Sequence, residues 1–100
     1  MPAAAVQGIR RVLADHPEVR RAVLYGSRAK GNYRNGSDID LTLFGNELSL
    51  GLLLQIMNEL DELLLPWTID LSLYSSIENP DLRDHIERVG IVFFDAPGVS

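Results

Sequence analysis

The stretch of sequence that most constrains this fold consists of two apolar runs separated by a polar segment. The first run, residues 22–25, ends at Gly26, and the second run, residues 41–44, begins directly after Asp40. Glycine, asparagine and basic residues fill most of the segment between them. Short apolar runs bounded by glycine and asparagine clusters are typical of strands. The sequence therefore predicts two strands joined by a polar loop.

Alternation along the second of these strands places several polar side chains on one face. Strand side chains point to opposite faces in turn, so Asp38, Asp40 and Thr42 share one face and the apolar residues between them share the other. Neighbouring carboxylates repel each other unless a cation lies between them or water surrounds them. Such oxygen ligands suit Mg²⁺, which proteins usually hold through one or two carboxylates and substrate phosphates. Gly26 and Ser27 supply backbone N–H groups and a hydroxyl, which suit phosphate oxygens.

Hydrophobic periodicity predicts the remaining elements and an α/β fold class. Helices are expected over residues 3–15, 49–64 and 80–89, and strands over residues 19–25, 38–44, 68–74 and, as a short last strand, 91–94. Because each strand precedes or follows a helix, we expect a small mixed sheet with helices packed on one face. Asp70, on the third long strand, is expected to join Asp38 and Asp40 on the open face.

Two further features lead to expectations about packing. His16 precedes Pro17, which ends the first helix, so His16 is expected to be an exposed turn residue and not a ligand. The helix at residues 49–64 carries more leucine, isoleucine and methionine than one buried face needs. This excess fits either a thoroughly buried core helix or a contact surface for another chain.

Composition limits the classes of function. With 100 residues and 46% hydrophobic content, residues 1–100 are expected to form a single domain. The absence of cysteine excludes disulfides and thiolate metal sites, and the net charge of −5 argues against direct nucleic-acid binding. No signal peptide or membrane-spanning segment is visible, so a cytoplasmic location is expected. The basic residues Arg28, Lys30 and Arg34 favour a local positive field for a triphosphate over a merely solvated loop.

A motif in this chain resembles the signature of a known family. Gly26-Ser27, ten intervening residues, and then Asp38 and Asp40 with one residue between them are similar to the motif of the DNA polymerase beta-like nucleotidyltransferases. The size is similar to that of the minimal nucleotidyltransferase (MNT) domains of bacteria and archaea. The resemblance implies a polymerase beta palm-like fold. It also implies a third carboxylate on a later strand, and Asp70 matches that position.

The resemblance also implies a role for each site residue. Asp38 and Asp40 would ligate two Mg²⁺ ions, or Mn²⁺ in their place. Asp70 would join one ion and help to deprotonate the acceptor hydroxyl. The implied activity is that of a metal-dependent enzyme that transfers a nucleoside monophosphate, AMP from ATP in the first instance, to a hydroxyl group.

The nucleotide-binding residues follow from the same resemblance. Gly26 and Ser27 would hold the β and γ phosphates of ATP or another nucleoside triphosphate. Arg28 or Lys30 could stabilise the departing pyrophosphate, a role that the family motif does not fix.

The implied partner is a second protein. The chain has no room for the acceptor-recognition domain of larger relatives, so we expect a small helical partner of the HEPN-like or substrate-binding type. In some such pairs the helical protein is a toxin, and the nucleotidyltransferase acts as its antitoxin by adenylylating a tyrosine. The alternative is a non-catalytic binding module that neutralises a helical partner by contact. A complex with that partner is expected, or failing that a homodimer.

Overall fold

The fold is taken from a computed structural model that describes residues 3–25, 39–65 and 69–96. In chain order the elements are α1 (Ala3–Ala14), β1 (Arg21–Tyr25), β2 (Ile39–Phe44), α2 (Leu50–Asp61), β3 (Ile69–Leu73), a 3₁₀ turn (Tyr74–Ser76), α3 (Pro80–Val89) and β4 (Ile91–Asp95). The predicted α/β class is confirmed. The predicted helices and strands are present, with ends that differ by a few residues from those expected.

The four strands form one mixed sheet in the order β3-β2-β1-β4. β1 runs antiparallel to both β2 and β4, whereas β2 and β3 are parallel. A parallel pair needs a crossover connection, and α2 supplies it between β2 and β3. Arg10 of α1 holds the β4 edge, because its Nε donates to the Phe93 carbonyl oxygen at 2.8 Å and its guanidinium carbon lies 5.2 Å from the Phe93 ring centroid.

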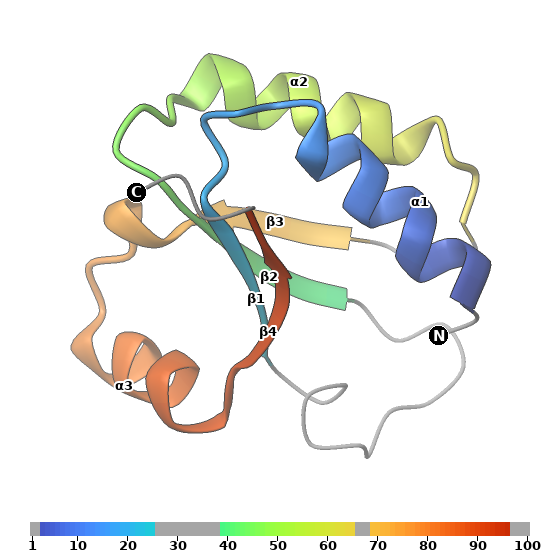
Figure 1. The fold of residues 1–100 in the computed structure, drawn as a ribbon. Coiled ribbons are helices and arrows are strands. Elements are labelled where there is room, and N and C mark those ends of the chain that lie inside the picture. Colours follow the sequence, from blue (N-terminus) through green and yellow to red (C-terminus); the bar gives the residue numbers. More distant parts are fainter. Residues whose placement is uncertain (1–2, 26–38, 66–68, 97–100) are drawn as a thin grey trace.

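The core lies between the sheet and the pair of helices α1 and α2, which cover one face of the sheet (Figure 1). Apolar side chains from both layers are almost fully buried there, among them Ile9, Leu13, Ile39, Leu41, Leu43 and Ile56. Burying one such side chain is worth roughly 1.5–3 kcal/mol.

The third helix, α3, lies on the other side of the sheet against β1 (Figure 1), so the expected packing of the helices on one face holds for α1 and α2 and is wrong for α3. The Asn79 side chain caps its first turn and Pro80 occupies its first position. At its end, a Cβ added to Gly90 would lie 2.3 Å from the Ile86 carbonyl oxygen and 2.4 Å from Val23 Cγ1. Glycine at this position lets the chain pass directly from α3 into β4.

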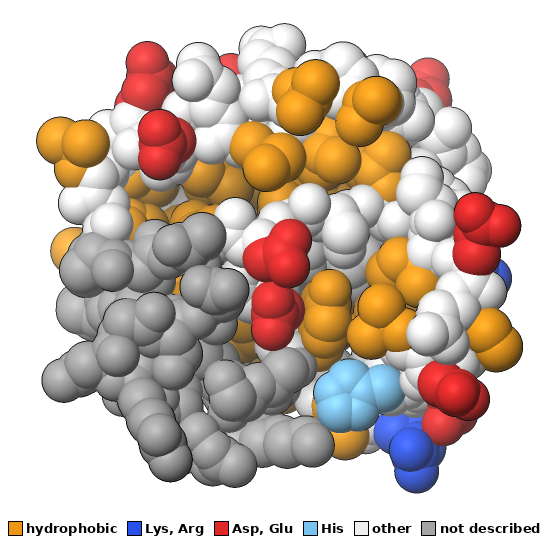
Figure 2. Space-filling view, turned by 180° about the vertical axis from the view of Figure 1, so that it is seen from behind, with side chains coloured by type: hydrophobic (Ala, Val, Ile, Leu, Met, Phe, Trp, Pro, Cys, Tyr) orange, Lys and Arg blue, Asp and Glu red, His pale blue; other side chains and the backbone are white. Residues whose placement is uncertain are grey.

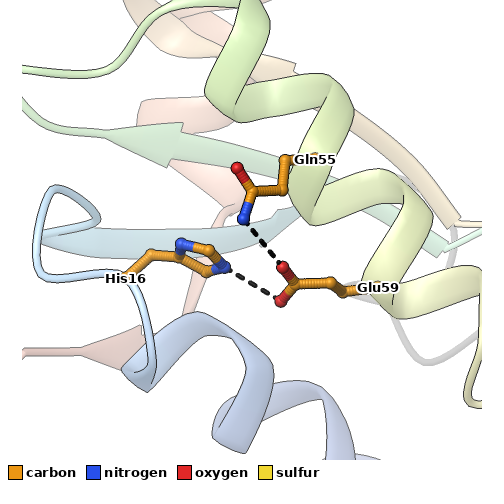
Figure 3. A network of polar contacts seen from close by, with 3 residues as sticks. All are labelled: His16, Gln55 and Glu59. Carbon is orange, nitrogen blue, oxygen red and sulfur yellow. Dashed lines mark hydrogen bonds and ion pairs between the residues drawn. The ribbon is translucent and has the colours of Figure 1, made fainter.

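His16 connects the end of α1 to α2 (Figure 3). Its Nε2 lies 2.9 Å from Glu59 Oε1, and Gln55 Nε2 donates to Glu59 Oε2 at 3.1 Å. The expectation of an exposed turn residue is wrong, because only 11% of the His16 side chain is exposed. The packing of α1 on α2 brings this turn against a second helix, and a local rule about Pro17 carries no information about such a contact.

The helix α2 is buried along one side only, although its apolar residues occur on more than one side. Ser49 caps it by accepting a hydrogen bond from the Leu52 N–H at 3.2 Å. One stripe is buried in the core, and a second apolar stripe is exposed, namely Leu50, Leu54 and Met57. A thoroughly buried core helix is therefore excluded. Within the described part of the chain, no helix is long and apolar enough to cross a membrane.

Candidate active site

Three polar side chains form a row across β1, β2 and β3. Asp40 of β2 is the register partner of Asp70 in β3, and on its other side Asp40 pairs with Tyr25 of β1. Register partners in neighbouring strands point to the same face, and the strands lie about 4.8 Å apart. Because the alternate residues Ile39 and Leu41 are buried in the core, this row lies on the face opposite to α1 and α2.

Two further rows follow along the same face. Thr42 pairs with Ser72, and weak hydrogen bonds cross between their strands, from Thr42 Oγ1 to the Ser72 carbonyl and from Ser72 Oγ to the Leu41 carbonyl, each at 3.5 Å. Beyond them the Phe44 and Tyr74 rings stack, with centroids 4.4 Å apart. The face therefore changes from carboxylates at one end, through hydroxyls, to aromatic rings at the other.

The aromatic end is covered by α3. The Arg83 guanidinium carbon lies 5.0 Å from the Tyr74 ring centroid, and the Tyr74 hydroxyl donates to Glu87 at 2.7 Å. At the other end Asp70 is exposed and Asp40 is half-buried. The carboxylate end is thus the part of this face that a ligand can reach among the described residues.

The carboxylates act electrostatically on Tyr25. Burial of its ring raises the Tyr25 pKa, and the negative charges of Asp40 and Asp70 raise it further, while a hydrogen bond with Ser72 acts in the opposite direction. Tyr25 therefore remains a protonated hydroxyl beside the two acids at neutral pH. Tyr25 was not among the predicted site residues. Its position directly before Gly26 was the available signal, but strand register was needed to place it beside Asp40.

The predicted site residues divide into two groups. The structure brings Asp40 and Asp70 together, whereas the others lie outside the described residues and their roles stay predictions, namely Gly26, Ser27, Arg28, Lys30 and Asp38. In the described ranges there is no group of three histidine, cysteine, aspartate or glutamate residues that could hold a metal ion. The paired carboxylates of Asp40 and Asp70 are hard oxygen donors that fit a divalent cation, which would need further ligands.

Comparison with known protein families gives a match over most of the chain. The family model for "Polymerase beta, Nucleotidyltransferase" matches residues 7–97. A comparison with curated protein sequences gives no match.

Solved structures share the fold at low sequence identity. A chain of a toxin–antitoxin complex with AMP-PNP is 22% identical with a TM-score of 0.75, over 91% of this chain and 73% of that chain. A chain of the MntA–HepT toxin–antitoxin complex is 18% identical with a TM-score of 0.70, and the match covers 95% of this chain and 74% of that chain. A chain of the complex between the tri-AMPylated Shewanella oneidensis HEPN toxin and an MNT antitoxin is 19% identical with a TM-score of 0.71, and the match covers 96% of this chain and 74% of that chain.

Proposed function

The chain belongs to the polymerase beta nucleotidyltransferase family, and from this premise we propose that it transfers AMP from ATP to a hydroxyl of a small helical HEPN-like partner protein. The observation that carries the proposal is the register pairing of Asp40 with Asp70 at the accessible end of the sheet. The choice of nucleotide and partner is supported by similar solved structures, one of which is a toxin–antitoxin complex with AMP-PNP and another a tri-AMPylated HEPN toxin with an MNT antitoxin.

The carboxylate pair would hold Mg²⁺, with Mn²⁺ as an alternative. Asp40 and Asp70 lie side by side, and we assign Asp38 as the further ligand that completes a site for two ions. Bound ions of this kind neutralise phosphate charge and stabilise the attacking and leaving oxygens of a displacement at phosphorus. Like charges directly opposite each other on neighbouring strands are unfavourable, and a bound cation would offset this repulsion.

The chain's own residues bind the nucleotide and handle the proton. Gly26 and Ser27 hold the β and γ phosphates, and Arg28 or Lys30 holds the leaving pyrophosphate. The acceptor oxygen bonds to the α phosphorus as the bond from that phosphorus to the bridging oxygen breaks and pyrophosphate leaves. Asp70 takes up the hydroxyl proton of the acceptor. The product is a phosphodiester between AMP and the partner's hydroxyl group.

The test is a transfer assay read by intact mass. The chain is co-expressed with the protein encoded by the adjacent gene, and the purified proteins are incubated with ATP and MgCl₂. We expect the partner to gain one or more AMP masses. Asp40→Asn and Asp70→Asn should each abolish the gain, because each variant removes a charge from the site while keeping the side-chain shape.

A matched control separates loss of the site from loss of any strand carboxylate. Asp95 lies on β4 of the same sheet, 3.8 Å from Arg21 and largely exposed, so Asp95→Asn should leave transfer unchanged. A complex that forms without any mass gain would support a non-catalytic binding module instead. Full transfer by the Asp40→Asn, Asp70→Asn double variant would refute the assignment of the site.

A further inference from the structure

The outward side of α2 carries an apolar surface that the fold does not use. Leu50, Leu54 and Met57 are 66%, 55% and 37% exposed, although the inner stripe of the same helix is already buried in the core. Their spacing of four and then three residues aligns them along one side of the helix. Figure 2 shows hydrophobic side chains gathered in the upper part of the molecule, where α2 lies. We call these three residues the α2 stripe.

A further exposed apolar residue follows α2 in the sequence. Leu64 follows Met57 after seven residues and is 88% exposed. Its φ of 55° lies in the left-handed region, which costs a residue with a Cβ roughly 1–2 kcal/mol. A leucine that is both strained and exposed does not stabilise the isolated fold. Its presence three residues after the end of α2 is consistent with contact to another molecule.

The charged residues in the segment that carries the α2 stripe are all acidic. Glu47 lies before the helix and Asp61 and Glu62 lie at its end, and the segment of residues 45–65 contains no lysine or arginine. Carboxylates at the C-terminus of a helix face the negative end of its macrodipole, which is unfavourable by a few tenths of a kcal/mol or more. A cation brought by another molecule would relieve this repulsion, so the flanking charges favour a basic partner.

The flanking charges also argue against a second copy of this chain as the occupant. Two α2 stripes packed on each other would bring acidic flanks together in either orientation, because both ends are negative. Three side chains alone also bury far less than the roughly 800 Å² per partner of a standard interface. The flanks must therefore take part in any stable contact with this surface.

We propose that the α2 stripe docks an amphipathic helix of the partner protein. The apolar side of that helix packs on Leu50, Leu54 and Met57, and its lysine or arginine side chains reach Asp61 and Glu62. The inference rests on the proposed function for the identity of the partner. Docking on α2 leaves the opposite sheet face, which carries Asp40 and Asp70, uncovered, so the acceptor hydroxyl must come from a part of the partner that does not contact the α2 stripe.

The test measures binding without ATP, so that docking and transfer are read separately. The full chain is titrated with the protein encoded by the adjacent gene in a calorimeter, at low and at high salt. Leu54→Ser should raise the Kd about tenfold or more, since the variant removes a large apolar side chain from the contact and leaves a polar one in its place. Asp61→Lys should also weaken binding and should reduce its dependence on salt.

A control and three outcomes decide the inference. Ile91→Ser, at a residue that is 51% exposed on β4, should leave the Kd unchanged, and circular dichroism should show that every variant is folded. An unchanged Kd for Leu54→Ser, or no complex with the adjacent-gene protein, would overturn the inference. A dimer of the chain alone that Leu54→Ser dissociates would also overturn it, since a second copy would then be the occupant. Binding as expected without AMP transfer would refute only the proposed function.

Discussion

Replacing Asp70 by asparagine should stabilise the metal-free protein while it disables the candidate active site. Asp40 and Asp70 are register partners, and like charges in that position destabilise a sheet by roughly 0.2–1 kcal/mol. Coulomb's law gives a similar value, about 0.8 kcal/mol for two unit charges ~5 Å apart in water, and water screens the pair because Asp70 is exposed. We expect the free energy of unfolding to rise by about 0.5 kcal/mol, which corresponds to roughly 2–4 °C in Tm.

The assay is urea denaturation followed by circular dichroism, once with EDTA and once with MgCl₂. Mg²⁺ should stabilise the wild-type protein more than the Asp70→Asn variant, because the variant has lost one of the paired carboxylates. Asp95→Asn is the control, and Mg²⁺ should act on it as on the wild type. If Asp70→Asn lowered the free energy of unfolding by about 1 kcal/mol or more in EDTA, the carboxylate would be making net stabilising contacts and the repulsion argument would be refuted.

Three further predictions concern pH and packing. The hydrogen bond with His16 lowers the Glu59 pKa, so the contribution of the Glu59 carboxylate to stability is complete above pH 4.5 and is lost as the pH falls through the lowered pKa. Glu59→Gln should therefore reduce the pH dependence of the urea midpoint over that acid range, and an unchanged pH dependence would contradict this. Gly90→Ala should destabilise by about 1–3 kcal/mol in urea denaturation, because its Cβ would meet Val23 Cγ1 at 2.4 Å; a neutral result would contradict the close approach. Burial raises the Tyr25 pKa above its ordinary 10.0, so Tyr25→Phe should remove one late-ionising tyrosine from an ultraviolet titration of the folded protein.

The pairing of Asp40 with Asp70 shows how far the sequence predicts the site. The strand period of two residues was enough to place each aspartate on the polar face of its own strand. The register between the two strands depends on where α2 returns the chain, which is a property of tertiary packing and not of either strand. Tyr25 was missed for the same reason, since its strand alone does not show that it lies beside Asp40.

The helices α1 and α2 show a second limit to what the sequence predicts. The excess of leucine in α2 was plain in the sequence, but the sequence could not show that Leu50, Leu54 and Met57 face outward, because that depends on which stripe meets the sheet. The expectation for His16 was wrong because it used only the neighbouring proline. Polar contacts between α1 and α2 form only after the two helices have packed, so no local pattern reports them.

The pairing of β4 with β1 has a consequence for synthesis on the ribosome. β1 is made early and pairs with β2 on one side, but its other edge has no partner until Asp95 has been added. Unpaired strand edges invite pairing with other chains and make partly folded species prone to aggregation. A chain whose synthesis pauses after α3 would therefore leave one edge of β1 without a partner strand. This is the species that we expect chaperones to protect.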